Sequence, residues 1–157
     1  MIKDKLYIPL SVIEEARGIL ASGEADCILI KDSKIIEVEK GRGISPLMNL
    51  YINKRDNMEG SVVVDKVVGK AAAMLCVCAK VKGVFAELIS QPASEYLLEK
   101  KILRSWTKLS ANIKNRQKDG ICPMEFSVLD EDDPHDGLNK LCTVFEKIKK
   151  SENIKEL

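Results

Sequence analysis

The sequence predicts an α/β fold, specifically a three-layer α/β/α sandwich with helices on both faces of one sheet. Segments with the apolar spacing of helices alternate with short segments rich in β-branched residues, which is the pattern of a covered sheet. The run 61–65 is dominated by consecutive valines, as is typical of a strand buried on both faces. With 157 residues, of which 45% are apolar, the chain can build one sizeable core.

A helix and a β-hairpin are predicted near the start of the chain. Ser11 and Glu14 have the spacing of a capping box, so a helix is expected over 12–21. The segments 25–30 and 35–38 are short and rich in β-branched residues, and the polar residues between them predict a tight turn.

Helices and strands alternate through the rest of the chain. Asp133 and Pro134 have the pattern of an N-cap and a first helical residue for the last helix. Similar signals predict helices that begin near Pro46, Ala71, Pro92 and Pro123, and strands over 61–65, 81–89 and 108–113. We interpret the sequence as a single domain over 1–150, followed by a disordered tail over 151–157.

Charge and composition exclude several classes of protein. Lysine and arginine total 25 against 24 aspartates and glutamates, so the net charge of +1 does not favour a polyanion-binding protein. His135 is the one histidine, which excludes a mechanism with two imidazoles. No apolar run approaches the roughly 20 residues that span a membrane, and the sequence shows no secretion signal. We therefore expect a cytoplasmic protein with no membrane partner. The five cysteines are odd in number and no export signal is visible, so we expect reduced thiols.

Three segments resemble an uncharacterised prokaryotic family of unknown function. They are 43–47 (Gly-Ile-Ser-Pro-Leu), 65–73 (Asp-Lys-Val-Val-Gly-Lys-Ala-Ala-Ala) and 120–125 (Gly-Ile-Cys-Pro-Met-Glu), and the resemblance spans roughly 8–145. The order of a helix, a hairpin and a small-residue helix after a strand is similar to the cytidine-deaminase-like fold. The resemblance implies that fold and no established activity.

The motifs of a zinc deaminase are missing from this chain. Such an enzyme needs a His or Cys ligand two residues before a catalytic Glu on one helix, and a Pro-Cys-x-x-Cys pair at the start of the next. The segment 69–73 has neither a ligand nor a Glu, and 91–95 has no cysteine. Cys76 and Cys78, two apart on a helix, point about 200° apart and cannot chelate one ion. We therefore expect no metal, no cofactor and no zinc-dependent deamination, and leave open whether the protein is an enzyme.

The first candidate site follows the strand at 61–65. Asp65, Lys66, Gly69 and Lys70 interrupt the apolar passage from this strand to the next helix. The carboxyl end of a strand and the following helix N-terminus form the usual ligand crevice of an α/β sheet, and free N–H groups there favour anions. Alternatively, both lysines are solvated, Asp65 caps the helix and Gly69 permits close packing.

The second candidate site is the start of the short helix at Pro123. Cys122 occupies the N-cap position, where the positive helix end favours a thiolate, and Glu125 can complete the cap or act as an acid or base. These two residues are our catalytic candidates. Alternatively, Cys122 is a small buried residue and Glu125 an ordinary capping glutamate. A pairing of Cys122 with His135 has no support in the sequence.

Two acidic features have weaker claims. Glu87 lies among apolar residues of a strand, so its side chain points either into the ligand crevice or into water at the strand end. The four acids at 130–133 could bind a divalent cation, but they lack the spacing of an EF-hand and are explained by the capped start of the last helix.

A basic stretch lies between Lys100 and Lys118. With Trp106 it could bind RNA by charge and stacking, but one aromatic residue and no RNA-binding motif make a solvated face the simpler interpretation.

The leading hypothesis is a protein that binds a nucleotide-like or phosphorylated small molecule. Asp65, Lys66 and Lys70 would orient this ligand, and Cys122 and Glu125 would lie near its reacting end, with chemistry other than deamination. The nucleotide part rests on fold analogy. The alternative is a catalytically silent module that forms homo-oligomers or binds a protein partner. A third hypothesis is an RNA-binding accessory protein, although nucleic acid is the less favoured partner.

Overall fold

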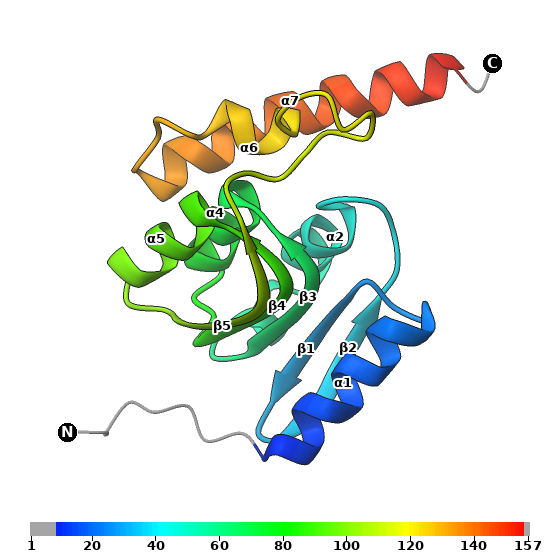
Figure 1. The fold of residues 1–157 in the computed structure, drawn as a ribbon, viewed down its shortest axis with the longest axis vertical. Coiled ribbons are helices and arrows are strands. Elements are labelled where there is room, and N and C mark those ends of the chain that lie inside the picture. The colour runs from blue at the N-terminus through cyan, green and yellow to red at the C-terminus, as the bar shows by residue number, and fades with distance from the viewer. Residues whose placement is uncertain (1–8, 156–157) are drawn as a thin grey trace.

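The computed structural model describes the backbone of residues 9–155 and the side chains of residues 9–151. Its strands form one five-stranded sheet in the order β2-β1-β3-β4-β5 (Figure 1). The strands are β1 (Cys27–Lys31), β2 (Lys34–Glu39), β3 (Val62–Val68), β4 (Gly83–Ser90) and β5 (Leu103–Ser110). The helices are α1 (Leu10–Ser22), α2 (Ser45–Asn53), α3 (Arg55–Met58), α4 (Lys70–Cys78), α5 (Gln91–Glu99), α6 (Pro123–Ser127) and α7 (Pro134–Lys155).

The direction of the strands determines where a site can form. β1 runs antiparallel to both β2 and β3, whereas β3, β4 and β5 are parallel to one another. The predicted hairpin of β1 and β2 is confirmed, and its turn residues Asp32 and Ser33 both have positive φ, 53° and 62°, as a tight two-residue turn requires. Because β3, β4 and β5 are parallel, their carboxyl ends meet at one edge of the sheet.

Helices cover both faces of the sheet, so the predicted α/β layered class is confirmed. α1 packs on one face through a small core that includes Ala16, Leu20, Ile28 and Val64. α2, α3, α4 and α5 contact the strands of the sheet from the other face (Figure 1). α6 and α7 pack on the outer side of α4 rather than on the sheet, so they add material beyond the layer of α4 and α5.

Small residues allow α4 to lie in the centre of this packing. Its residues Ala71, Ala72 and Ala73 are all buried, and short side chains let the helix approach the sheet and its neighbours closely. α7 crosses α4 at Gly137, where a Cβ atom would lie 2.5 Å from the Cε atom of Met74. The two helices therefore approach closely at this glycine, and a side chain here would require the flexible end of Met74 to move.

The predicted capping box at the first helix is wrong. α1 begins at Leu10 with Pro9 at the N-cap position, and no side chain caps it. The helix starts before Ser11 because the backbone N–H of Val12 already donates to the Pro9 carbonyl, so Ser11 falls inside the first turn. Glu14 pairs with Arg17 instead.

The other departures are at the last strand and the last helix. β5 spans Leu103–Ser110, so it begins five residues before the predicted segment 108–113 and ends three residues before that segment does. The sequence hid this strand because it is an edge strand with many exposed residues, so its polar composition lacks the signal of a buried strand. α7 continues to Lys155, past the expected domain end at 150, since no Pro or Gly interrupts 151–155; residues 156–157 of the expected tail lie outside the described residues. None of the helices in the described part of the chain is long and apolar enough to cross a membrane.

Candidate functional site

The carboxyl ends of β3 and β4 are flanked by two different environments. On the α4 face, a crevice between the starts of α4 and α5 is filled by the side chain of Glu125. On the α1 face, a groove of about 630 Å³ is open to solvent. Of the predicted ligand-binding residues, the structure places Gly69 and Lys70 beside the crevice, Lys66 and Glu87 in the groove, and Asp65 in neither.

Glu125 fills the crevice as a buried carboxylate that is 1% exposed. Its Oε1 atom accepts hydrogen bonds from the Lys70 backbone N–H, at 3.0 Å, and from the Ser90 hydroxyl. Its Oε2 atom accepts from the Ile113 backbone N–H, at 2.5 Å. Glu125 therefore caps α4, and not the helix in which it lies, which is the finding that departs most from the expected capping role.

The surrounding sequence explains why the carboxylate fits. A Cβ atom on Gly69 would lie 3.0 Å from Ile113 Cγ1 and 3.3 Å from Glu125 Oε1, so a larger residue would require Ile113 and the carboxylate to shift by a few tenths of an ångström. Ser90 is the N-cap of α5 and also accepts from the Ala93 N–H at 3.2 Å, so Glu125 reaches the start of both helices. α6 itself is anchored in the core by Met124 and Val128, which are 6% and 0% exposed.

Lys70 does not direct its charge into the crevice. Its Nζ atom donates to the Leu129 carbonyl at 2.7 Å and lies 5.6 Å from the centre of the Tyr96 ring. Burial lowers the pKa of Lys70. The Tyr96 hydroxyl donates to the Asp132 carbonyl at 3.0 Å. The side chains of Lys70 and Tyr96 therefore both bind backbone carbonyls of the loop before α7.

Asp65 lies in the core of the α4 face with buried thiols near it. It is 7% exposed and accepts from the Val67 N–H at 3.3 Å, and burial raises its pKa to about 7. Burial also raises the pKa values of Cys27 and Cys76, so both thiols stay protonated at neutral pH. Asp65 is thus enclosed by protein and does not face either hollow.

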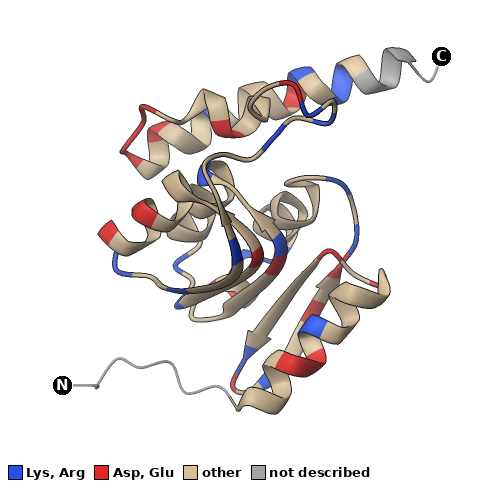
Figure 2. Ribbon diagram, viewed as in Figure 1, with Lys and Arg blue, Asp and Glu red and all other residues tan. Residues whose placement is uncertain are grey.

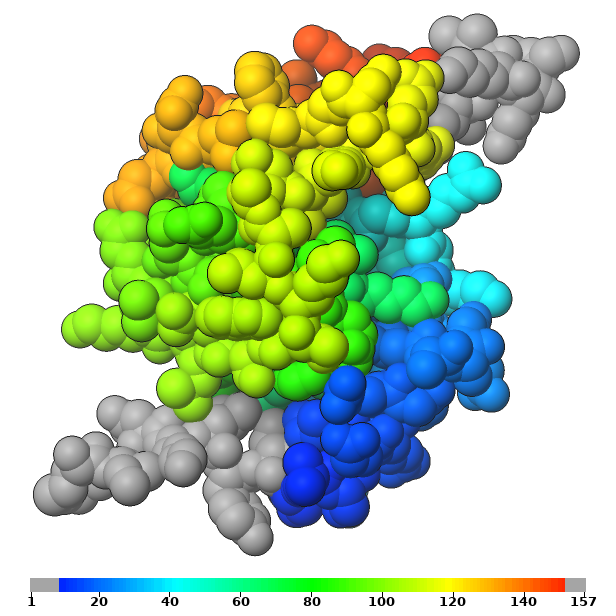
Figure 3. Space-filling view, in the orientation of Figure 1, coloured from blue at the N-terminus to red at the C-terminus, as the bar shows by residue number. Residues whose placement is uncertain are grey.

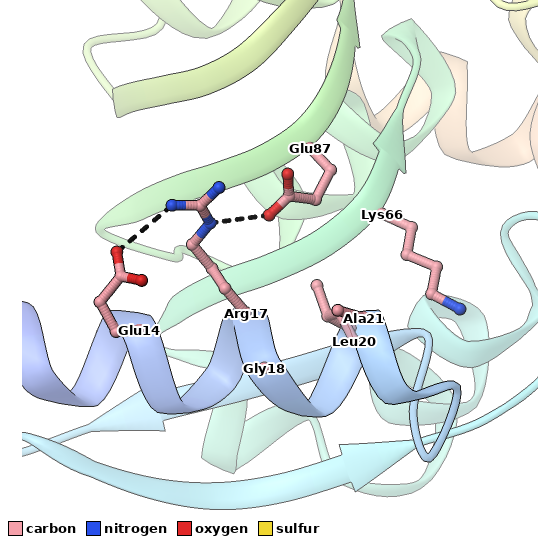
Figure 4. Close-up of a pocket in the computed structure, with 7 residues that line it drawn as sticks. All are labelled: Glu14, Arg17, Gly18, Leu20, Ala21, Lys66 and Glu87. Carbon is pink, nitrogen blue, oxygen red and sulfur yellow. Dashed lines mark hydrogen bonds and ion pairs between the residues drawn. The ribbon is translucent and has the colours of Figure 1, made fainter.

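The open groove brings together residues of α1, β3 and β4. Arg17 reaches from α1 to Glu87, and its Nε atom donates to Glu87 Oε1 at 2.8 Å (Figure 4). The Thr107 hydroxyl donates to Glu87 Oε2 at 2.9 Å. Lys66 lies farther along the groove, where its Nζ donates to Asp26 Oδ1 at 2.7 Å. The groove is therefore lined by charges of both signs.

These charges are accessible and stabilise one another. The side chains of Arg17, Lys66 and Glu87 are 34%, 39% and 32% exposed. The hydrogen bond from Arg17 lowers the pKa of Glu87, and the hydrogen bond from Lys66 lowers the pKa of Asp26. Both carboxyls are therefore ionised at neutral pH. Lys66 uses one of its three N–H donors on Asp26, which leaves donors for another acceptor.

Cys122 occupies the predicted N-cap position of α6. Its side chain is half-buried against the core and makes no capping hydrogen bond. Its backbone N–H donates to the Ile113 carbonyl at 2.8 Å. The geometry thus joins Glu125, and not the Cys122 thiol, to the start of α4, and a reactive role of Cys122 stays a prediction.

The acidic and basic stretches have structural partners. Asp133 caps α7 as expected, and its Oδ1 accepts from the N–H groups of His135 and Asp136, each at 2.9 Å. Across the ranges whose side chains are described, no group of three or more His, Cys, Asp or Glu residues could hold a metal ion. In the basic stretch, Arg104 donates to the Ser94 hydroxyl at 2.8 Å and lies over Trp106. Figure 2 shows further basic residues in the loop before α6 and along the end of α7.

Three residues of these sites were missed from the sequence. Arg17 gave no signal, because one arginine on the polar face of a helix is common. The backbone N–H of Ile113 cannot be found by side-chain chemistry at all. Ser90 could have been found, since a serine two residues before Pro92 is an N-cap pattern.

The residues at the crevice do not fit a zinc ion of the kind that zinc deaminases bind. α4 begins Lys70-Ala71-Ala72 and α5 begins Gln91-Pro92-Ala93, and these side chains supply no zinc ligand. The one carboxylate present, that of Glu125, already accepts hydrogen bonds at both oxygens. The starts of α4 and α5 therefore lack the ligands of a zinc deaminase.

The chain is similar to proteins of one family of unknown function. The family model TM1506, a domain of unknown function (DUF1893), matches residues 15–144. A solved structure of a DUF1893 family protein (TM1506) from Thermotoga maritima is 28% identical, covers 90% of this chain and 92% of that chain, and has a TM-score of 0.76. RibD from Acinetobacter baumannii is 16% identical over 60% of this chain and 34% of that chain, with a TM-score of 0.42. A search of the curated proteins found no match. The predicted resemblance to an uncharacterised family is confirmed, and the chain belongs to the DUF1893 family.

Proposed function

We propose that this protein binds a small phosphorylated or nucleotide-like molecule in the groove between α1 and the ends of β3 and β4. The observation that carries this proposal is the groove itself, about 630 Å³ in volume and lined by Arg17, Lys66 and Glu87. Small-molecule sites commonly have volumes of about 300–1,000 Å³ and a few convergent polar groups. The position beside the carboxyl ends of parallel strands is also the usual ligand position of an α/β sheet.

Lys66 and Arg17 would recognise the anionic part of such a ligand. Lys66 has free donors, and its ion pair with Asp26 is exposed enough for a phosphate to share the ammonium group. Glu87 is held by Arg17 and Thr107 with its carboxylate ionised, so it can accept hydrogen bonds from hydroxyl or amino groups of a sugar or base. Leu20, Ala21 and Gly18 supply the apolar wall of the groove.

The residues that line the groove are charged or apolar, and none of them is a Ser, Thr, Cys, Tyr or His. The residues that line it are Glu14, Arg17, Gly18, Leu20, Ala21, Lys66 and Glu87. Recognition of an anionic ligand by Lys66 and Arg17 is the activity that this lining supports best. The predicted catalytic residues lie elsewhere, Cys122 at the N-cap of α6 and Glu125 within α6. The Glu125 carboxylate forms its hydrogen bonds on the other face of the sheet.

The test is a thermal-shift screen with nucleotides, sugar phosphates and inorganic phosphate, followed by titration of Lys66→Ala. A ligand at one hundred times its Kd should stabilise the wild type by about 2.7 kcal/mol. Lys66→Ala should weaken a phosphorylated ligand by about tenfold or more, because a charge-assisted hydrogen bond is lost.

Lys54→Ala is the matched control, since Lys54 is also an exposed lysine paired with a carboxylate, Glu37, at 2.8 Å, but outside the groove. It should bind as the wild type does. Equal losses in the two variants would show an effect of net charge and contradict the groove. Absence of any shift would favour the alternative of a silent partner-binding module, for which β5 offers an edge strand with exposed Leu103 and Leu109.

A further inference from the structure

The crevice at the starts of α4 and α5 has the construction of an anion-binding site. Three donors from separate segments converge on one carboxylate: the N–H groups of Lys70 and Ile113 and the hydroxyl of Ser90. The Lys70 N–H belongs to the first turn of α4, where no intrahelical acceptor exists, and no side chain at the N-cap, Gly69, takes its place. The starts of α4 and α5 both add positive potential here.

The anion in this crevice is held without a cationic side chain. Among the residues whose side chains are described, no Lys, Arg or His forms an ion pair with Glu125, and the nearby Lys70 donates its ammonium to Leu129. The carboxyl group of Glu125 is 1% exposed, and its polar partners are the converging donors at the two helix starts. The donors reach both oxygens of one carboxyl group, which is an arrangement that suits a carboxylate.

At this contact α6 buries an acidic residue and exposes an aromatic one. Glu125 is 1% exposed, whereas the next residue, Phe126, is 67% exposed. A short surface helix ordinarily buries the aromatic ring and leaves the acid in water. In Figure 3 the segment before α6 and α6 itself, in yellow, lie directly over the green body of the molecule. α6 leaves its phenylalanine in solvent while it places a carboxylate in the crevice, which is how an internal ligand would be delivered.

We propose that Lys70 N–H, Ile113 N–H and Ser90 Oγ form an oxyanion-binding site, and that the chain closes it to external anions with its own Glu125 carboxylate. The site takes a small carboxylate such as formate once the internal one is removed. Glu125 thus acts as a built-in competitor at the place where the fold would otherwise bind a ligand. This inference concerns the α4 face and is independent of the groove on the α1 face.

The experiment is rescue of Glu125→Ala by formate. Thermal unfolding is followed in sodium formate and in sodium chloride of equal ionic strength, with formamide as the neutral analogue of formate. We expect formate to raise the Tm of Glu125→Ala saturably by about 3 °C or more relative to chloride. Formamide should have no such effect, and the wild type should show no difference between formate and chloride, because its site is already filled.

Glu131→Ala is the matched control, because Glu131 also accepts from backbone N–H groups, those of Asp132 and Asp133, but pairs with Lys140 near the surface. It should show no rescue by formate. A folded Glu125→Ala protein with equal Tm in formate and chloride would overturn the proposal, and so would equal rescue of Glu131→Ala.

Glu125→Gln decides the matter if Glu125→Ala does not fold in chloride. The amide keeps the size of the side chain and one accepting oxygen but removes the charge. A loss of about 5 °C or more in Tm supports a site built for an anion, because the converging donors then lack their charge. A Tm within about 1 °C of the wild type overturns the proposal, since packing alone would then explain Glu125.

Discussion

The closed crevice and the open groove each hold a glutamate carboxylate, which is buried in the protein in the crevice and partly exposed to water in the groove. Each contains a glutamate beside the carboxyl ends of β3 and β4, one on each face of the sheet. Glu125 is 1% exposed and is held by two backbone N–H groups and a hydroxyl, whereas the Glu87 side chain is 32% exposed and is held by Arg17 and Thr107.

The comparison shows which carboxylate a ligand can replace. Backbone donors inside the protein cannot turn to water, so removal of Glu125 leaves them without partners. Arg17 and Thr107 are side chains at the surface, and water or a ligand can satisfy them. The Glu125 carboxylate is therefore part of the folded structure. In the groove, by contrast, a solute can replace the contacts of Glu87 with little loss of free energy.

The largest effect on stability should come from removal of Glu125, and removal of Glu87 provides the comparison. Glu125→Ala should lower the free energy of unfolding by about 4 kcal/mol, because buried donors lose a charged acceptor. Glu87→Ala should cost less than about 1 kcal/mol, as exposed ion pairs contribute little. Urea unfolding at pH 7 measures both values, and similar losses for the two variants would remove the distinction between the sites.

A second test concerns Asp65, a buried carboxyl on the same face as Glu125 but with fewer donors. Its pKa is raised to about 7 in the folded protein, against 3.8 for an unperturbed group. The folded state therefore binds more protons than the unfolded state between these two values, so this group makes stability fall as pH rises from about 4 to 7.

Asp65→Asn should remove that dependence, because the amide cannot ionise. The variant should gain stability relative to the wild type as pH rises, by at most about 4 kcal/mol at pH 8, and should differ little near pH 4. Guanidinium unfolding of both proteins at pH 4.5, 6 and 8 provides the measurement. A difference that is the same at all three values would show that Asp65 does not titrate in this range.

A third and smaller test uses one glycine from each site. A Cβ atom on Gly69 would press on Ile113 and on the Glu125 carboxylate, so Gly69→Ala should cost about 1–2 kcal/mol. Gly18 lies within α1 in the wall of the groove and has nothing within 4 Å of an added Cβ atom. Gly18→Ala should therefore stabilise the protein by up to about 1 kcal/mol, as alanine does in helices.

The two glycine variants should also differ in ligand binding. A larger side chain at the same position, Gly18→Met, should occupy the groove and weaken the ligand found by the thermal-shift screen, while Gly69→Ala leaves the affinity unchanged. Equal affinity of Gly18→Met and the wild type would place the ligand elsewhere.

The sequence by itself determined the layered α/β class and most of the elements. The hairpin, the alanine-rich helix after β3 and the Asp133 cap of α7 depend on residues close together in the chain, so spacing and capping chemistry predict them. The absence of zinc-deaminase motifs is likewise a local property. The first half of β5 was not predicted, because an edge strand carries polar residues at its exposed positions.

The tertiary structure alone decided what occupies the end of the sheet. The sequence predicts an anion at the start of α4, and the anion found there is Glu125, which comes from 55 residues away along the chain. Likewise Glu87 meets Arg17 across a separation of 70 residues. Residue type shows that a helix start favours negative charge, but the identity of the partner depends on how distant segments pack, and that is a property of the whole fold.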